Sequence, residues 1–261
     1  MKICAIPLDI KYASPEENLL TAARELSQVE KDTDVVVLPE LFTTAFVPDT
    51  ATVASLAEEN TGKTVETLKR WAQFFGFAIA GSFLAKDDKR HYYNRAFFVE
   101  PMGDVTFYDK RHLFPLSTED KVYSPGHALP PRIRYRGWDF SIVVCFDLRF
   151  PVWCRNVPDH LYDVLLVPSN WPHSRISQYK ILLAGRAVEN QIYVIGCNRM
   201  GKDEYGEYLH SDSGIYDNLG NPIQETRRNG HLYTLVERKD LDEGRRRFPA
   251  FQASDRWTIE L

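Results

Sequence analysis

Paired cysteines, histidine clusters and an export signal are all missing from this sequence of 261 residues. Its four cysteines form no C-x-x-C pair, and its seven histidines show no zinc-site spacing. No metal site is therefore expected. In a protein that is not exported, the thiols are expected to be reduced. Cys4, Cys154 and Cys197 are interpreted as small buried residues, whereas Cys145 requires a separate explanation.

Long apolar runs and a strong excess of one charge are also missing. No stretch approaches the ~18 apolar residues of a membrane span. The first ten residues, MKICAIPLDI, are interrupted by Pro7 and Asp9, unlike a secretory signal peptide. The formal net charge is −4, which argues against a nucleic-acid surface, and the basic run 245–247 is interpreted as a solvated face. We expect a cytoplasmic protein without membrane or nucleic-acid partners.

What the sequence does contain is a set of apolar runs typical of an α/β domain. Helices are expected from Pro15 to Val29, over 64–75 and over 178–191. Strands are expected at 2–10, 34–39, 77–84, 92–99, 105–108, 139–145, 163–168, 193–197 and 231–236. Runs such as DVVVLP have no polar face and need cover on both sides. We therefore predict one domain over 1–261, with helices outside and sheets inside.

Two segments do not fit regular structure. Residues 110–131 contain several prolines and glycines and are predicted to form a long loop, which in a compact domain is often functional. The aromatic tail that begins at Phe248 is expected to pack on a neighbouring element or on a partner chain.

Three reactive residue types stand where apolar strands end. Glu40 follows DVVVLP, Lys110 follows VTFYD, and Cys145 follows SIVV. Ligands of open α/β folds bind beyond the carboxyl ends of strands. A carboxylate, an ammonium and a thiol at such ends are therefore expected to share one pocket.

The chemistry of these three groups is complementary. A thiol with a pKa of about 8.5 needs a base such as Glu40 to become a nucleophile. Lys110 and the backbone N–H of Phe146 would stabilise an oxyanion. Each residue alone has a plainer interpretation, as a buried thiol, a turn acid or a solvated lysine. His112 is interpreted as a loop residue that bonds backbone rather than as the base.

The motifs around these residues resemble those of the carbon–nitrogen hydrolase, or nitrilase, superfamily. They are VVVLPELF, YDKRHLF and VVCFDLRFP, in the family's order, and SNWP followed by an arginine is similar to its ω-amidase branch. The resemblance implies an αββα sandwich that assembles as a homodimer, and the aromatic tail of about 245–261 is expected at the dimer interface. It also implies a Glu40–Lys110–Cys145 triad that needs no cofactor, and a second glutamate, Glu119, that positions Lys110 or the substrate.

The resemblance further implies a small amide substrate. An ω-amidase hydrolyses monoamides of dicarboxylic acids, such as 2-oxoglutaramate and 2-oxosuccinamate. Their free carboxylate would suit Arg175, with Arg149 and Arg186 as alternatives that are interpreted as structural. The candidates for the pocket walls are Phe42, Phe114 and Trp171. A nitrilase, another amidase or an acyltransferase remain alternatives, because the triad alone does not separate these enzymes. A non-catalytic binding protein is a further alternative, against which the intact Glu40, Lys110 and Cys145 argue.

Overall fold

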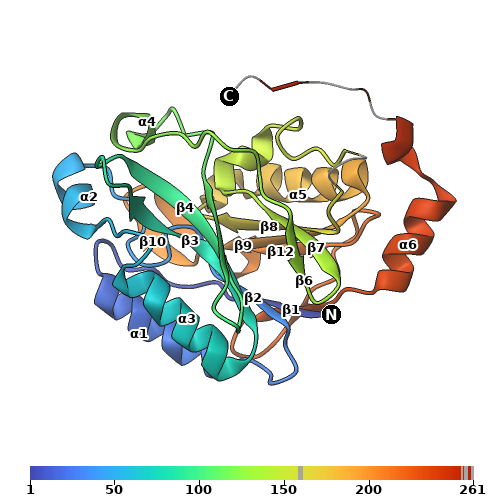
Figure 1. Cartoon of the computed structure of the whole chain (residues 1–261), viewed down its shortest axis with the longest axis horizontal. Helices are drawn as coiled ribbons and strands as arrows, with labels where there is room; N and C mark the ends of the chain where they lie inside the picture. Colours follow the sequence, from blue (N-terminus) through green and yellow to red (C-terminus); the bar gives the residue numbers. More distant parts are fainter. Residues whose placement is uncertain (158–160, 254, 256–257, 260–261) are drawn as a thin grey trace.

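Two β-sheets pack face to face, and helices cover both outer sides (Figure 1). The computed structural model describes residues 1–157, 161–253, 255 and 258–259. The predicted αββα sandwich is confirmed, and both sheets mix parallel and antiparallel pairs. Of the predicted tail interface, residues 254, 256–257 and 260–261 lie outside the described part of the chain.

The larger sheet has seven strands and includes both the first and the last strand predicted from the sequence. In spatial order its strands are β13 (Glu225–Thr226), β14 (Leu232–Leu235), β1 (Lys2–Ala5), β2 (Val35–Val37), β3 (Ala78–Lys86), β4 (Tyr92–Val99) and β5 (Val105–Asp109). Strands β1, β2 and β3 are parallel to each other, and the remaining pairs are antiparallel. The carboxyl ends of the parallel strands therefore open at one edge of the sheet.

The smaller sheet has five strands, and a short hairpin stands apart from it. The order of the five is β12 (Gly214–Tyr216), β9 (Tyr193–Asn198), β8 (Val164–Ser169), β7 (Trp138–Ile142) and β6 (Ile133–Tyr135). The hairpin consists of β10 (Gly201–Asp203) and β11 (Gly206–Tyr208). Strands β7, β8 and β9 run parallel, so their carboxyl ends also share one edge.

Helices complete the outer layers. The α-helices are α1 (Pro15–Leu26), α2 (Thr50–Leu56), α3 (Lys63–Phe75), α4 (Glu119–Val122), α5 (Ile176–Asn190) and α6 (Arg238–Arg247). The 3-10 helices are η1 (Cys145–Arg149), η2 (His173–Arg175), η3 (His210–Asp212) and η4 (Ala250–Ala253). Helices α1 and α3 pack on the larger sheet, and α5 packs on the smaller one (Figure 1).

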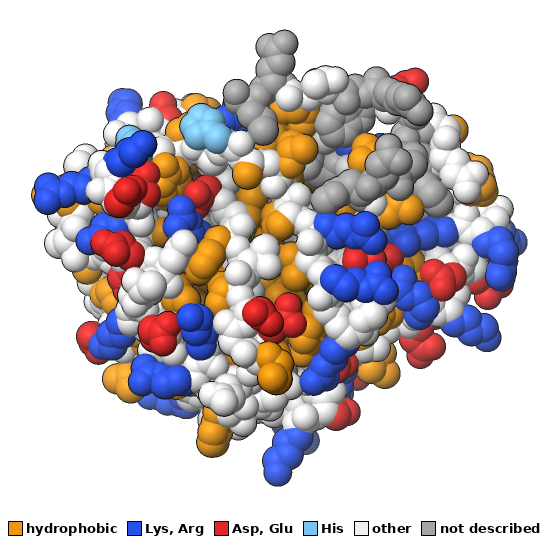
Figure 2. All heavy atoms as spheres, in the orientation of Figure 1, with side chains coloured by type: hydrophobic (Ala, Val, Ile, Leu, Met, Phe, Trp, Pro, Cys, Tyr) orange, Lys and Arg blue, Asp and Glu red, His pale blue; other side chains and the backbone are white. Residues whose placement is uncertain are grey.

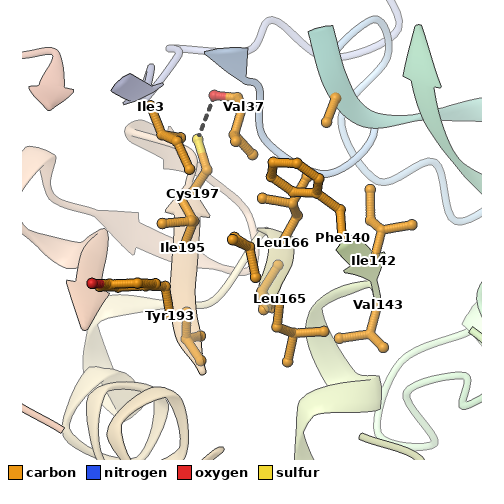
Figure 3. Packing of buried hydrophobic residues seen from close by; sticks show 14 of the residues in the cluster. Ile3, Val37, Phe140, Ile142, Val143, Leu165, Leu166, Tyr193, Ile195 and Cys197 are labelled. Atoms are coloured by element: carbon orange, nitrogen blue, oxygen red, sulfur yellow. Dashed lines mark hydrogen bonds between the residues drawn. The ribbon is translucent and has the colours of Figure 1, made fainter. Parts of the chain in front are cut away.

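The alternation of side chains explains why two layers form. On β2, Val35 and Val37 belong to the core between the sheets, whereas Val36 packs under the helices. Figure 3 shows Ile3 and Val37 of the larger sheet facing residues of the smaller one. The Cys197 thiol donates to the Val37 carbonyl at 3.1 Å and so links the two sheets. A continuous apolar strand is thus buried on both faces, as its sequence predicts.

Several local predictions need correction. The first strand ends at Ala5 rather than at residue 10, since Pro7 has no N–H for a ladder. The strand predicted over 139–145 ends at Ile142. Helix α1 begins at Pro15 as predicted, but the Ser14 hydroxyl donates to the Tyr12 carbonyl instead of capping the helix.

The basic run near the chain's end is only partly solvated. It forms the last turn of α6, where the Arg245 guanidinium binds the buried carboxylate of Asp163 at 2.7 Å. Elsewhere on the face in Figure 2, cationic and anionic side chains are interspersed. Among the described residues, no helix is long and apolar enough to cross a membrane. Within the same residues, no three acidic, histidine or cysteine side chains gather as a metal site.

Candidate active site

The three reactive side chains meet in one cavity of about 400 Å³. Glu40 follows β2, Lys110 follows β5, and Cys145 follows the loop after β7, so all three come from strand ends of the two packed sheets. Their exposed fractions are 4 %, 2 % and 9 %. Charged groups that are this well buried need partners to offset the loss of hydration.

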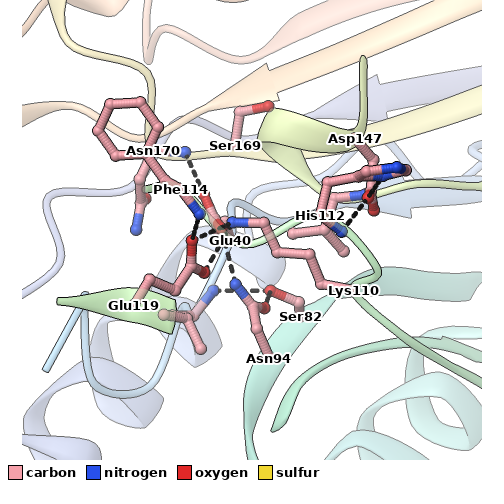
Figure 4. Close-up of polar contacts among 12 residues, drawn as sticks. Glu40, Ser82, Asn94, Lys110, His112, Phe114, Glu119, Asp147, Ser169 and Asn170 are labelled. Atoms are coloured by element: carbon pink, nitrogen blue, oxygen red, sulfur yellow. Dashed lines mark hydrogen bonds and ion pairs between the residues drawn. The ribbon is translucent and has the colours of Figure 1, made fainter. Parts of the chain in front are cut away.

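Lys110 lies between two carboxylates (Figure 4). Its Nζ is 2.9 Å from Glu40 Oε1 and 2.7 Å from Glu119 Oε1. Burial acts to lower the pKa of Lys110, but the charges of Glu119 and Glu40 outweigh it and raise that pKa well above its ordinary value. Burial, opposed by the charge of Lys110, raises the pKa of Glu119. Glu119 also accepts the Phe114 N–H at 2.6 Å, which ties the loop to the lysine.

Cys145 is presented on a strained turn. Its φ of 45° lies in the left-handed region, which is unfavourable for a residue other than glycine. Contacts with the surrounding structure must stabilise this conformation. Burial and the charge of Glu40 raise the pKa of the thiol well above its ordinary value, while Lys110 and the Asn170 backbone amide act against them. The resting thiol is therefore neutral, and a base must take its proton before sulfur can attack.

A buried carboxylate joins the lysine loop to the cysteine turn. Asp147 accepts from the Val144 N–H at 3.1 Å and the Tyr108 hydroxyl at 2.8 Å with one oxygen. Its other oxygen accepts from the His112 N–H at 2.9 Å and lies 2.8 Å from the His112 ring nitrogen. The His112 ring therefore contacts the Asp147 carboxylate rather than a backbone group, which corrects the prediction for this residue.

The outer cavity combines aromatic rings with two guanidinium groups. Phe114, Phe146 and Trp171 line it. The Arg175 guanidinium lies 4.9 Å from the centre of the Phe114 ring, and that of Arg149 lies 4.8 Å from the centre of the Trp171 ring. The cavity therefore combines a buried lysine between two carboxylates with two further cationic side chains that pack on aromatic rings.

The sequence profile of the family described as "Carbon-nitrogen hydrolase" matches residues 2–246. The chain belongs to the carbon–nitrogen hydrolase family. It is therefore an enzyme that hydrolyses carbon–nitrogen bonds.

Individual relatives of this carbon–nitrogen hydrolase cover nearly the whole chain. Omega-amidase YafV of Escherichia coli (strain K12) is 37 % identical, over 99 % of this chain and 98 % of its own. The 2-oxoglutaramate amidase of Bacillus subtilis (strain 168) is 32 % identical, over 95 % of each chain. The crystal structure of XC1258 from Xanthomonas campestris, a CN-hydrolase superfamily protein with an arsenic adduct in its active site, superposes with a TM-score of 0.92. It is 31 % identical and covers 100 % of this chain and 99 % of its own.

Two residues of this hydrolase differ from their predicted roles in the cavity. Phe42 is fully buried on the helix side of the larger sheet, with its ring 5.8 Å from that of Phe97, so it does not line the cavity. Arg149 does line the cavity and bonds to Gln178 at 2.6 Å rather than serving only the fold. Arg186 is structural as predicted, because it binds the Leu148 carbonyl.

Other residues of the hydrolase's cavity were missed from the sequence. Phe46 follows the Glu40 turn, and Tyr205 and Tyr208 come from the β10–β11 hairpin, which closes one side. Asn94, on β4, donates to Glu40 at 2.7 Å. The one signal for Asn94 was a polar residue amid the apolar positions of its strand, and such a residue is usually solvated.

Proposed function

We propose that this enzyme is an ω-amidase that hydrolyses the terminal amide of a small dicarboxylic acid monoamide to the acid and ammonia. The observation that carries the proposal is a buried lysine, ion-paired to two carboxylates, in the same cavity as Cys145. The printed functions of the E. coli and B. subtilis relatives support the substrate class.

In the proposed first half-reaction, Glu40 takes the proton of the Cys145 thiol. The sulfur then attacks the amide carbonyl, and the oxyanion is held by the Lys110 ammonium and the Phe146 backbone N–H. When the tetrahedral intermediate collapses, Glu40 passes the proton to the departing nitrogen. Ammonia leaves, and the acyl group remains on sulfur as a thioester.

In the proposed second half-reaction, water replaces ammonia. Glu40 removes a proton from the water, whose oxygen attacks the thioester carbonyl at the same oxyanion position. The carbon–sulfur bond breaks, Cys145 regains its proton, and the acid leaves. Glu119 positions Lys110 throughout, because it binds the lysine through both oxygens, at 2.7 and 3.0 Å.

The substrate's free carboxylate is proposed to bind Arg175, with Arg149 as the second guanidinium of the cavity. A planar guanidinium matches the two oxygens of a carboxylate. Arg175 is held above Phe114, and its carbonyl accepts from the Trp171 indole at 3.1 Å, so the anchor is ordered before substrate arrives. 2-Oxoglutaramate and 2-oxosuccinamate are the proposed substrates.

The test is ammonia release from a panel of ω-amides of keto and non-keto acids, together with a nitrile of matching chain length. Cys145→Ala should abolish release, whereas the matched variant Cys4→Ala should retain it, since Cys4 is buried on the helix side of the larger sheet. Release by Cys145→Ala would refute the mechanism. Faster turnover of the nitrile than of its amide would favour a nitrilase instead.

We also propose that the enzyme is a cytoplasmic homodimer, with the tail of about 245–261 at the subunit interface. The 70 % exposed side chain of Phe248, at the end of α6, supports such a contact. Sedimentation velocity should give a dimer for the native chain and a larger monomer fraction for Phe248→Glu. Cell fractionation tests the location.

A further inference from the structure

The two oxygens of Glu40 have different surroundings. Oε1 accepts from Lys110 Nζ at 2.9 Å and from Asn94 Nδ2 at 2.7 Å. Oε2 accepts from the Asn170 backbone N–H at 2.8 Å. A carboxylate offers about four acceptor positions. Oε1 is therefore fully used, and the position left open by the described residues is on Oε2.

The amide of Asn94 has only one satisfactory orientation. The Ser82 hydroxyl accepts from the Leu41 N–H at 2.8 Å, so its own proton is free to donate to Asn94 Oδ1, also at 2.8 Å (Figure 4). Since Asn94 Oδ1 is the acceptor for Ser82, its NH₂ must face Glu40. Both side chains are buried, with exposed fractions of 0 % and 1 %, so water does not compete with these bonds.

The supports of this chain of bonds are rigid. Ser82 lies on β3 and Asn94 on β4, in one antiparallel ladder of eight residue pairs. The ladder pairs Ser82 with Ala96, two residues beyond Asn94, so Ser82 and Asn94 are diagonal neighbours on one face. Leu41, which follows Glu40, has a φ of 47°, and its N–H is held by Ser82. One serine therefore fixes both the strained turn after Glu40 and the amide that contacts its carboxylate.

We propose that Asn94, oriented by Ser82, is a positioning residue that occupies Oε1 of Glu40 and leaves Oε2 as the oxygen that exchanges protons with Cys145. The inference rests on the proposed role of Glu40 as the base. Without Asn94, one position on Oε1 becomes free, the carboxylate can rotate, and the proton acceptor is no longer defined. The loss of a donor also makes protonation of the carboxylate easier.

The test compares Asn94→Ala, Ser82→Ala and the double variant with the native enzyme, over the pH range of activity. Asn94→Ala should lower kcat about 10- to 100-fold, as expected for losing a bond to a charged group, with KM changed less than about threefold. The acidic limb of kcat/KM should move to higher pH by about one unit. Ser82→Ala should shift the limb in the same direction, and the double variant should shift it no further than Asn94→Ala, because Ser82 reaches Oε1 of Glu40 only through Asn94. Loss of the bond from the Leu41 N–H to Ser82 is a separate effect that should lower kcat further.

Asn156→Ala is the matched control. It removes a buried amide that bonds to the Tyr162 backbone and to Asn190, away from the cavity, so it should lower thermal stability and leave the acidic limb in place. A native limb and kcat in Asn94→Ala, or an equal limb shift in Asn156→Ala, would overturn the proposal. If Asn94→Ala does not fold, a native limb in Ser82→Ala has the same meaning.

Two further variants separate this inference from the proposed function. If Glu40→Gln or Cys145→Ala still releases ammonia, the proposed mechanism, with Glu40 as base and Cys145 as nucleophile, is wrong, whatever Asn94 does. If both are inactive and Asn94→Ala behaves as native, only the positioning role is wrong. The rate of Cys145 alkylation by iodoacetamide, followed against pH in native and Asn94→Ala protein, gives the same comparison without a substrate.

Discussion

Replacing Glu119 by glutamine tests whether a buried acid outside the triad is needed to hold the lysine. In the native enzyme, Oε1 accepts from Lys110, and Oε2 accepts from both Lys110 and the Phe114 N–H. A glutamine has the same shape but offers only one oxygen. Wherever its oxygen points, the NH₂ faces a donor, either the ammonium or the N–H. Glu119→Gln therefore loses at least one charge-assisted hydrogen bond.

The magnitude follows from that loss. A hydrogen bond to a charged group contributes about 1.5–3 kcal/mol, and about 1.4 kcal/mol corresponds to a factor of ten. If Lys110 acts on the oxyanion, Glu119→Gln should lower kcat about 10- to 150-fold, with a smaller change in KM. Steady-state ammonia release with the best ω-amide measures both constants. Circular dichroism confirms that the variant is folded.

The matched control for this prediction is Asp120→Asn. Asp120 is the next acid on α4 and is exposed, so its loss removes the same formal charge without touching Lys110. Native kcat is expected for Asp120→Asn. Native kcat in Glu119→Gln would refute the positioning role, and equal losses in the two variants would show that only the net charge of the loop matters.

Three other changes have defined outcomes. Arg175→Met should raise KM for 2-oxoglutaramate about 10- to 150-fold but leave KM for a neutral short amide within about threefold, with Arg149→Met as the comparison; equal effects on both substrates would exclude Arg175 as the carboxylate anchor. Burial raises the pKa of Cys154 to about 12, so the folded state keeps this proton longer than the unfolded state. The contribution of Cys154 to the free energy of unfolding is complete below a pH of about 8.5, and above that pH it falls by about 1.4 kcal/mol per pH unit. In urea unfolding, the free energy of Cys154→Ala should therefore decline less steeply with alkaline pH than that of the native protein. An equal dependence on pH in the two proteins would contradict this prediction. Asp147→Asn should lower the free energy of unfolding by about 2–3 kcal/mol, since an amide NH₂ would face donors that the carboxylate now accepts; an unchanged urea midpoint would argue against this bracing role.

The sequence best predicts the site residues whose positions depend on where strands end. Glu40, Lys110 and Cys145 each follow an apolar run, and parallel strands bring such ends to one edge, so their meeting needed no knowledge of side-chain orientation. The same logic was wrong for Phe42, because the positive φ of Leu41 turns the chain after Glu40 and carries the ring into the helix-side core.

Residues that depend on orientation were harder to predict. Arg149 lies on η1, three residues after Phe146, and both line the cavity, whereas the sequence suggested a structural role for this arginine. Asn94 stands between Tyr93 and Arg95, and only the register of β3 with β4 brings it to Glu40. Register is a tertiary property, which a single strand's pattern does not contain.

The carboxylate of Asp147 has a practical meaning for redesign of the enzyme. It is shared by the segment after β5 and the turn that carries the nucleophile, so these two stretches are interdependent parts even though they are distant in the chain. A loop transplanted after Lys110 to change substrate choice must supply a donor to Asp147 equivalent to His112. A graft that lacks this donor would displace the Cys145 sulfur as well as Lys110. The resulting loss of activity would then reflect a displaced nucleophile rather than a change of substrate preference.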